Sequence, residues 1–230
     1  MKHADARGHF LGGVTPSATF DDAAAQGAYE RFGKRAFDVA LAIALAPFVG
    51  LVIAVLCAVV FAADRRAPLF GHRRVGRGDV PFTCWKVRTM APDAEARLEK
   101  ILAEDPESAA EWRANHKLAH DPRITRIGEF LRRTSLDELP QIWNVLRGEM
   151  SFVGPRPVTE PELEKYGAAR SAYCAVRPGI TGLWQVSGRN SLSYEERVAL
   201  DARYARGVGF RRDLRILLGT VGVVFRPTGV

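Results

Sequence analysis

Residues 39–63 read VALAIALAPFVGLVIAVLCAVVFAA and contain no charged side chain. These 25 residues exceed the ~20 apolar helical residues that cross a ~30 Å hydrocarbon core. Lys34 and Arg35 precede the stretch, and Arg65 and Arg66 follow it. The chain therefore has one segment suited to a membrane, with basic side chains at both of its ends.

The proline at position 47 divides this stretch into a short arm, residues 39–46, and a longer arm, residues 47–63. Proline inside a helix removes a backbone hydrogen bond and crowds the preceding turn, which produces a kink. Lysine and arginine mark the cytoplasmic side of a bacterial membrane protein, so a re-entrant hairpin would satisfy both basic flanks. A spanning helix that tolerates its proline explains the residues equally well.

The composition limits the partners of the chain. A net charge of +7 and a pI of about 9.7 favour anionic partners such as lipid head groups, diphosphates or nucleic acid. The aromatic residues do not alternate with arginines as a base-stacking platform requires, so we expect no nucleic-acid binding. Cys57, Cys84 and Cys174 are far apart, which indicates a reducing compartment and no zinc site.

Three regions follow from these patterns: a flexible tail (1–30), a membrane-embedded segment (31–66) and a compact domain (67–230). The predicted fold class is mostly α with a small β-hairpin, to which amphipathic interfacial helices are added. Alternating residues at 67–90 predict the hairpin, with its turn at 76–79. Helical patterns follow at 92–104, 108–118, 124–131, from position 135 or 137, and from position 193.

Two further segments admit two interpretations each. His116 and His120 stand four residues apart, as in a helical metal site, but no third ligand is near in sequence and we do not expect a metal there. Residues 213–225 are mostly aliphatic and begin with several arginines nearby. This segment could lie in the membrane interface with its apolar face down, or form a core helix.

The strongest chemical signal is the adjacent pair Asp137 and Glu138, which follows Arg132 and Arg133. Ser135 and Glu138 match a capping box, so the pair is expected at a helix N-terminus. The helix dipole and the arginines would favour ionised carboxylates there. An ionised aspartate can form a covalent intermediate, and a second carboxylate can hold Mg²⁺. The simpler alternative is that both acids only cap a helix.

Three arginines in rigid turns weigh against that simpler alternative. Arg156, Arg177 and Arg189 each lie in a segment rich in glycine and proline within about 50 residues of the acid pair. Rigidly placed guanidinium groups bind phosphate through two parallel hydrogen bonds. The spacing therefore predicts a site for a phosphorylated, anionic substrate.

The motifs resemble those of a known family. Five of them occur in order: Lys34-Arg35-Ala36-Phe37-Asp38, Lys86-Val87-Arg88-Thr89-Met90, residues 134–141, residues 151–157 and residues 177–190. In this order they are similar to the monotopic bacterial sugar transferases, or polyprenyl-phosphate phosphoglycosyl transferases. The resemblance covers about residues 31–225 and is greatest to the short members that initiate exopolysaccharide synthesis, the undecaprenyl-phosphate galactose or glucose phosphotransferases.

The resemblance implies a reaction and a role for each matching residue. Such enzymes transfer a sugar 1-phosphate from a UDP-sugar to undecaprenyl phosphate and release UMP. Asp137 is then the nucleophile that forms a phosphosugar adduct, and Glu138 helps to hold Mg²⁺. The basic residues expected to contact phosphate or nucleotide sugar are Lys86, Arg88, Arg132, Arg156, Arg177 and Arg189.

The resemblance also implies a location and partners. The family's membrane element is re-entrant and breaks at a Ser-Pro pair, where this sequence has Ala46-Pro47. We therefore expect the cytoplasmic face of a bacterial inner membrane, with membrane lipids, undecaprenyl phosphate and UDP-galactose or UDP-glucose as partners. A homodimer is left open. The competing hypothesis is a non-catalytic membrane adaptor whose arginines bind anionic lipid or a partner protein.

Overall fold

The computed structural model describes residues 27–115, 118 and 120–224. A short π-helical turn, η1 (Tyr29–Gly33), leads into the long helix α2 (Lys34–Asp64). Within these residues, four strands form two small sheets: β1 (Leu69–Val75), β2 (Pro81–Val87), β3 (Ser151–Val153) and β4 (Gly179–Thr181). The other α-helices are α3 (Ala94–Glu104), α4 (Pro106–Asn115), α5 (Arg126–Thr134), α6 (Gln141–Arg147), α7 (Glu160–Glu164), α8 (Arg170–Ala175), α9 (Leu183–Ser187), α10 (Tyr194–Ala205) and α11 (Phe210–Val224). The mostly helical fold class predicted from sequence is confirmed.

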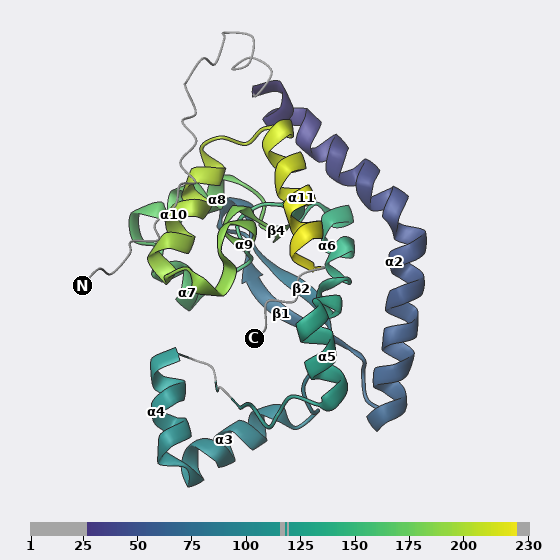
Figure 1. Cartoon of the computed structure of the whole chain (residues 1–230), viewed down its shortest axis with the longest axis vertical. Helices are drawn as coiled ribbons and strands as arrows, with labels where there is room; N and C mark the ends of the chain where they lie inside the picture. The colour runs from purple at the N-terminus through teal and green to yellow at the C-terminus, as the bar shows by residue number, and fades with distance from the viewer. Residues whose placement is uncertain (1–26, 116–117, 119, 225–230) are drawn as a thin grey trace, which may run out of the picture.

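Helix α2 runs along one side of the molecule (Figure 1). It is a single α-helix of 31 residues that contains Pro47, and it ends where Arg65 adopts a left-handed conformation with φ of 57°. Figure 1 shows the helix slanting in its first part and running vertically in its second. The two expected arms form one continuous helix, because one missing backbone hydrogen bond bends a helix without ending it, and the re-entrant course through a membrane stays a prediction.

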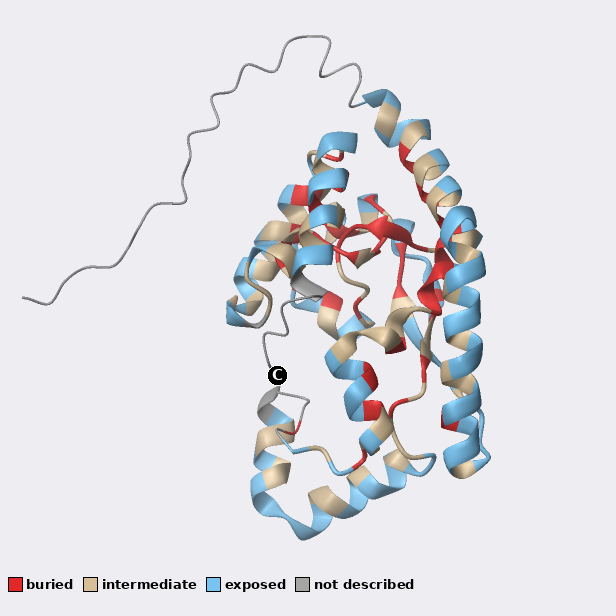
Figure 2. Cartoon of the chain, turned by 45° about the vertical axis from the view of Figure 1, so that its right-hand side comes forward, coloured by how far each residue is buried: buried red, intermediate tan, exposed pale blue. Residues whose placement is uncertain are grey.

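The outward surface of α2 is apolar and exposed. The segment Tyr29–Asp64 is long and apolar enough to cross a membrane, and little of its most apolar part is buried. Figure 2 shows exposed residues along the outer side of α2, while burial is concentrated between the helix and the strands. Its exposed apolar side chains include Ile43, Leu45, Phe48, Leu51, Val52, Val55, Val59 and Phe61. An apolar surface of this extent marks contact with lipid or another protein.

Both ends of α2 are fastened to the same folded body. At the N-terminal end, Lys34 Nζ lies 2.7 Å from Asp213 Oδ2 of α11, and both side chains are buried. One turn later, the buried Asp38 accepts hydrogen bonds from the Ser151 hydroxyl and the Phe152 backbone N–H. At the C-terminal end, Asp64 receives two hydrogen bonds of 2.7 Å from Arg88. The helix therefore lies against the domain along its length.

The predicted hairpin is confirmed as β1 and β2, which pair antiparallel from Leu69 opposite Val87 to Val75 opposite Pro81. Its turn includes the 3₁₀ segment η2 (Arg77–Asp79), in which Gly78 has a φ of 69° that glycine adopts without strain. The parallel pairing of β3 with β4 was not expected from the sequence. Three residues per strand are too few to show a periodic pattern.

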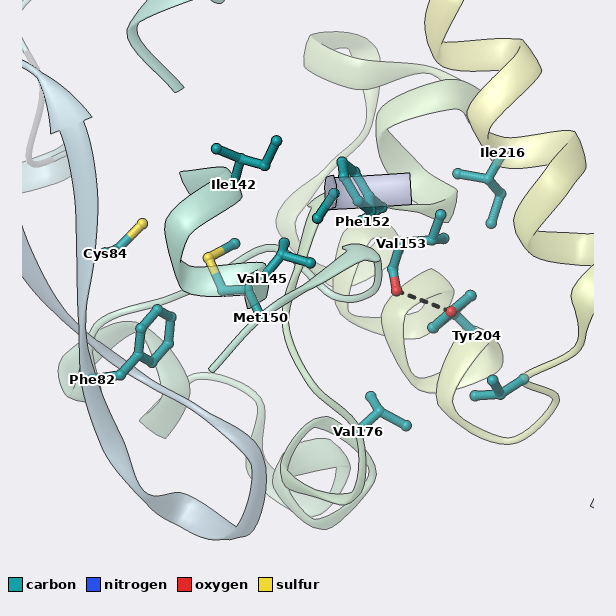
Figure 3. Packing of buried hydrophobic residues seen from close by; sticks show 12 residues of the cluster. Phe82, Cys84, Ile142, Val145, Met150, Phe152, Val153, Val176, Tyr204 and Ile216 are labelled. Atoms are coloured by element: carbon teal, nitrogen blue, oxygen red, sulfur yellow. Dashed lines mark hydrogen bonds between the residues drawn. The ribbon is translucent and has the colours of Figure 1, made fainter. Parts of the chain in front are cut away.

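The main core lies between β2, α6, β3, α10 and α11 (Figure 3). Figure 3 shows Phe82 and Cys84 on one side, Val145 and Met150 in the middle, and Ile216 on the other side. In the same view, the Tyr204 hydroxyl donates a 3.0 Å hydrogen bond to the Val153 carbonyl. This core joins the strand that carries Lys86 to the turn that carries Arg156.

Several expected helices have different starts. Helices at 92–104 and 108–118 correspond to α3 and to α4, which begins at Pro106. A capping box that joins Ser193 to Glu196 starts α10 as predicted. The last helix begins at Phe210, before the expected position 213, and it packs on the core with one side only, so its place in a membrane interface stays a prediction. Ile216 is 2% exposed and Leu218 is 64% exposed, so one side is core and the other is open.

The predicted capping box at Ser135 and Glu138 is wrong. Ser135 adopts a left-handed conformation with φ of 57° and caps the C-terminus of α5. The acid pair lies in the separate 3₁₀ turn η3 (Leu136–Glu138), and α6 begins only at Gln141, after Pro140. A proline is tolerated at a helix start and not in the turns that follow, so the helix begins later than the sequence suggested.

The metal interpretation of the two histidines receives no support from the described residues. His116 lies outside them, and His120 is exposed. Over residues 27–115, 118 and 120–224, no three histidine, cysteine, aspartate or glutamate side chains gather as a metal site would require. Most of the expected flexible tail, residues 1–30, also lies outside the described part.

Candidate active site

The two acids are presented by one tight turn between two helices. Asp137 and Glu138 occupy consecutive positions of η3, and the Glu138 backbone N–H donates to the Ser135 carbonyl over 3.3 Å. Asp137 is buried, with 7% of its surface exposed. A 3₁₀ turn advances one residue by about 120°. The two carboxylates can therefore leave the turn in different directions and still meet one cation.

Lys86 of β2 is that cation. Its Nζ lies 2.7 Å from Glu138 Oε1 and 3.7 Å from Asp137 Oδ2. The lysine belongs to the hairpin and the acids to the segment after α5, so 52 residues of chain separate the hydrogen-bonded partners. This contact brings together two motifs that the sequence analysis could only place in order.

Two arginines complete the charged cluster. Arg156, in the turn after β3, places one guanidinium nitrogen 3.5 Å from Glu138 Oε1. Arg132, in the last turn of α5, donates from Nε to the Thr89 hydroxyl over 2.9 Å and raises the positive potential at Asp137. Three cations thus surround two carboxylates. The excess of positive charge suits a substrate that carries several negative charges.

The pKa values of the two carboxylates are shifted in opposite directions. Burial raises the pKa of Asp137, and the Glu138 charge adds to this, while Lys86, Arg132 and Arg156 oppose it. Burial would also raise the pKa of Glu138, but Arg156 and Lys86 outweigh it and hold that pKa below its ordinary value. The nearby cations favour the ionised form of both acids, as expected, but at Asp137 the effect of desolvation on the pKa exceeds theirs.

A small pocket opens beside Glu138. Its walls contain Lys86 and Arg156 together with residues that the sequence analysis did not select; the full lining is Arg74, Cys84, Lys86, Glu138, Gln141, Arg156, Pro157, Gly179 and Ile180. Arg74 forms a 2.8 Å ion pair with Glu162. Strand alternation was the signal that could have found Arg74. Its neighbour across the hairpin is Phe82, which shares a face with Cys84 and Lys86.

Comparison with known proteins identifies the family. The family model described as bacterial sugar transferase matches residues 29–227. The chain belongs to the bacterial sugar transferase family. The matched region contains η1, α2 and every later element, so it includes both the apolar helix and the charged cluster.

Individual members of the family are close in sequence. A UDP-galactose-lipid carrier transferase of Erwinia amylovora is 49% identical over 86% of this chain and 42% of its own length. The exopolysaccharide production protein ExoY of Rhizobium meliloti is 47% identical over 85% of this chain and 87% of its own length. An undecaprenyl-phosphate galactose phosphotransferase of Salmonella typhimurium is 44% identical over 86% of this chain and 42% of its own length. The chain thus spans less than half of some of these relatives and most of another.

Three of the arginines that were expected to contact the substrate do not line this pocket in the described part of the chain. Arg88 makes four hydrogen bonds, to both carboxylate oxygens of Asp64 and to the carbonyls of Ala67 and Met90. Arg177 donates from Nε to the Gly148 carbonyl at the end of α6 over 2.8 Å. Arg189 lies in η5 (Arg189–Ser191) with φ of 51°, and within the described chain it does not line the pocket. The structure thus groups Lys86, Arg132 and Arg156 with the acids, and uses Arg88 and Arg177 to join elements.

The carboxylates offer suitable ligands for magnesium. Glu138 Oε1 and Asp137 Oδ2 both point to the Lys86 ammonium, so the site already collects two hard oxygen donors around one positive charge. Mg²⁺ in enzymes is commonly held by one or two carboxylates together with substrate phosphates and water. Glu138, the more acidic of the two, fits that role.

Proposed function

We propose that this chain transfers a sugar 1-phosphate from a UDP-sugar to undecaprenyl phosphate and so starts an exopolysaccharide. The observation that carries the proposal is the buried Asp137 beside Glu138 and Lys86, in a chain with a long, exposed apolar helix. Relatives named for galactose transfer, at 49% and 44% identity, support galactose as the sugar. A relative named for glucose 1-phosphate transfer, from Escherichia coli, is 36% identical.

The first half-reaction is an attack by Asp137. One of its carboxylate oxygens forms a bond to the phosphorus that carries the sugar, and the bond from that phosphorus to the bridging oxygen breaks. The electron pair leaves with UMP, and the sugar phosphate stays on Asp137. Lys86, Arg132 and Arg156 offset the charge that collects on the phosphate oxygens.

The second half-reaction returns Asp137 to its starting state. A phosphate oxygen of undecaprenyl phosphate attacks the phosphorus of the adduct, and the bond to the Asp137 oxygen breaks. The lipid product carries a diphosphate linked to the sugar. Mg²⁺, when bound through Glu138, would supply positive charge to the diphosphate of the donor. Because one carboxylate takes part in both steps, the two anionic substrates need not occupy the site together.

The docking of α2 supports a monotopic position on the cytoplasmic face of the inner membrane. Lys34 and Asp64, at the two ends of the helix, each pair with a residue of the same domain. A helix that crossed the bilayer fully would place these two ends in different compartments. A helix that enters and leaves on one side keeps both ion pairs and still buries its apolar surface in lipid.

The direct test measures UMP release from UDP-galactose by the purified protein in nanodiscs that contain undecaprenyl phosphate and Mg²⁺. We expect Asp137→Asn to lower turnover by about 10³-fold or more, because the amide is a poor nucleophile. Asp93→Asn, at an exposed carboxylate before α3, is the matched control and should keep wild-type turnover. Near-normal turnover of Asp137→Asn would remove the nucleophile assignment.

Two further measurements distinguish the transferase from the competing hypothesis. Mass spectrometry of protein given donor alone should find a hexose phosphate on the peptide that contains Asp137. A panel of UDP-sugars, scored by UMP release, identifies the sugar. A membrane adaptor, the competing hypothesis, would release no nucleotide with any donor.

A further inference from the structure

Gln141 carries a buried amide that the fold does not use. It is the first residue of α6, it has 1% of its surface exposed, and it lines the pocket beside Glu138. No hydrogen bond joins its side chain to another residue in the described part of the chain. Buried amides are normally paired, because a donor or acceptor without a partner costs free energy. The Gln141 amide therefore suits a ligand that enters the pocket and accepts its N–H.

A second amide on the same helix shows what a structural role requires. Asn144 lies three residues after Gln141, and residues at this spacing share one face of a helix. The Asn144 amide accepts a 3.1 Å hydrogen bond from the Trp85 N–H and donates over 2.7 Å to the Thr83 carbonyl. These bonds hold α6 against β2, whose Cys84 side chain points toward α6 (Figure 3). The fold thus uses the amide of Asn144 and leaves that of Gln141 to the pocket.

Arg74 of β1 reaches the same pocket from the hairpin. One terminal nitrogen of its guanidinium lies 2.8 Å from Glu162 Oε2, and the other donates to His72 Nδ1 over 3.1 Å. Glu162 is itself held, because its carboxylate accepts from the N–H and the hydroxyl of Thr159 at the start of α7. The other N–H groups of Arg74 have no hydrogen-bond partner among the described residues. A guanidinium that is oriented from two sides and keeps unused donors can bind an anion without rearrangement.

The pocket has the charge and the place of a phosphate subsite. In the described chain its lining contains one carboxylate and three cations, Arg74, Lys86 and Arg156. Asp137 does not belong to this lining, and Lys86 connects the two places, with Nζ 3.7 Å from Asp137 Oδ2 and 2.7 Å from Glu138 Oε1. A nucleotide-sugar donor has two adjacent phosphate groups. When the attacked phosphorus is at Asp137, the pocket on the Glu138 side is the place for the second phosphate.

We propose that Arg74 and Gln141 bind the donor phosphate that departs with the nucleoside. The Gln141 amide and the unused N–H groups of Arg74 donate to its oxygens, while Glu162 keeps the guanidinium in place. The inference rests on the proposed function and adds two substrate contacts outside the arginines selected from sequence. The competing interpretation is structural: Arg74 would only join β1 to α7 through Glu162.

Calorimetric titration with UMP tests the role of Gln141 without turnover, on the full-length protein in nanodiscs with Mg²⁺. We expect Gln141→Met to weaken UMP binding by at least about tenfold, the effect of one lost hydrogen bond to a charged group. The KM for UDP-galactose should rise by a similar factor. Methionine has a similar length and helix propensity, and no hydrogen bond of the fold is lost. The variant should therefore unfold at the wild-type temperature or above it.

A set of three variants tests Arg74 against the structural interpretation. Arg74→Met should also weaken UMP binding by at least about tenfold. Glu162→Gln breaks the same ion pair but keeps the Arg74 charge, and glutamine can still accept the hydrogen bonds of Thr159. Its UMP affinity should stay within about threefold of wild type. Arg73→Met, at the exposed neighbouring position of β1, is the control for the lost charge and should bind UMP as wild type does.

Three results would overturn the proposal. The first is a UMP affinity within about twofold of wild type in Gln141→Met or in Arg74→Met. The second is an equal loss of affinity in Glu162→Gln and Arg74→Met, which would assign the effect to the broken ion pair. The third is an equal loss in Arg73→Met, which would assign it to net charge alone.

The outcomes also separate this inference from the proposed function. Wild-type protein that releases no UMP from any UDP-sugar would overturn the transferase, whereas the UMP titration would still measure the subsite. Active wild-type protein whose UMP affinity is unchanged in Gln141→Met and in Arg74→Met would overturn the subsite alone.

Discussion

At the residue scale, the site depends on two neighbouring carboxylates with different acidities. Asp137 is desolvated and its pKa is raised, whereas the pKa of Glu138 is lowered by Arg156 and Lys86. Glu138 is therefore ionised over a wide pH range and suited to bind a cation. Asp137 is less solvated, which makes its ionised form more reactive toward phosphorus. The same dipeptide thus provides two chemical roles because its two side chains have different surroundings.

The raised pKa of Asp137 predicts how the rate depends on pH. The nucleophile must be ionised, so kcat/KM for the donor should increase as pH rises through the pKa of Asp137. Lys86 lowers that pKa, so in Lys86→Met the rise of kcat/KM should occur at a pH that is higher by about one unit or more. Lys100→Met, at an exposed lysine of α3, should leave the pH of this rise unchanged. If the rise of kcat/KM stays at the same pH or moves to a lower pH in Lys86→Met, the assignment of Asp137 as the ionised nucleophile is contradicted.

Asp201 predicts a pH-dependent stability. Burial raises its pKa from 3.8 to about 7, so ionisation costs the folded state more than the unfolded state. Stability should fall as pH rises from about 4 to about 7. Asp201→Asn removes this cost and should gain on the order of 4 kcal/mol at pH 8, and much less at pH 4.

The groups that face Asp201 do not reverse this sign. Arg156 stays charged, and Tyr166, Tyr173 and Tyr194 have raised pKa values, that of Tyr194 being about 12, so all three tyrosines stay neutral. Denaturant unfolding of wild type and Asp201→Asn at several pH values measures the difference. An advantage of the variant that is equal at pH 4 and pH 8 would show that ionisation is not its cause.

At the element scale, arginines join α2 and α6 to their neighbours. Arg35 donates to the Val145 and Leu146 carbonyls, and Arg177 donates to the Gly148 carbonyl, so both cap the C-terminal end of α6. A helix C-terminus has carbonyls without intrahelical partners and a partial negative charge, which two guanidinium groups satisfy. This explains why arginines occur in these motifs at positions outside the pocket.

Arg88 shows how a motif residue can differ in role from its neighbour Lys86. Its side chain holds Asp64 at the end of α2 through two parallel hydrogen bonds of 2.7 Å. Arg88→Lys should lower the unfolding temperature, because lysine cannot form the same pair of bonds, and should leave the donor KM unchanged. Arg73→Lys, at an exposed position of β1, is the control. A raised donor KM in Arg88→Lys without loss of stability would instead show that Arg88 contacts the substrate.

At the scale of the whole molecule, the bent apolar helix α2 and the charged cluster are connected through the same buried core. The buried pair of Lys34 and Asp213 joins α2 to α11, and the Tyr29 hydroxyl donates to the same aspartate. The core between β2 and α11 then continues to the turn of Arg156. Through these contacts the depth of α2 in a membrane would fix the height of Asp137 above it.

This arrangement predicts the sidedness of the helix ends. In a background without the native cysteines, Arg31→Cys and Arg66→Cys should both react with an impermeant maleimide in inverted membrane vesicles. Both positions are exposed. Glu99→Cys, on the exposed side of α3, marks the side of the catalytic domain. Reaction of Arg31→Cys only in right-side-out vesicles would establish a spanning helix.

The sequence by itself determined what depends on local order. An uncharged stretch of 25 residues requires an apolar surrounding, alternation around residues 76–79 produces a hairpin, and five ordered motifs define the family. It also supplied the acid pair and the basic residues Lys86, Arg132 and Arg156. The hairpin could be inferred because alternation and turn residues act within a few positions of each other, whereas the roles of the acid pair and the basic residues rest on the family's motifs and stay a prediction.

Tertiary structure decided which charges meet and how deeply they are buried. The raised pKa of Asp137, the place of Arg74 in the pocket and the role of Arg88 all follow from partners far along the chain. The unpaired burial of Asp201 is a property of the packed core. Electrostatic energy depends on distance and on exclusion of water, and only the folded chain sets these two quantities.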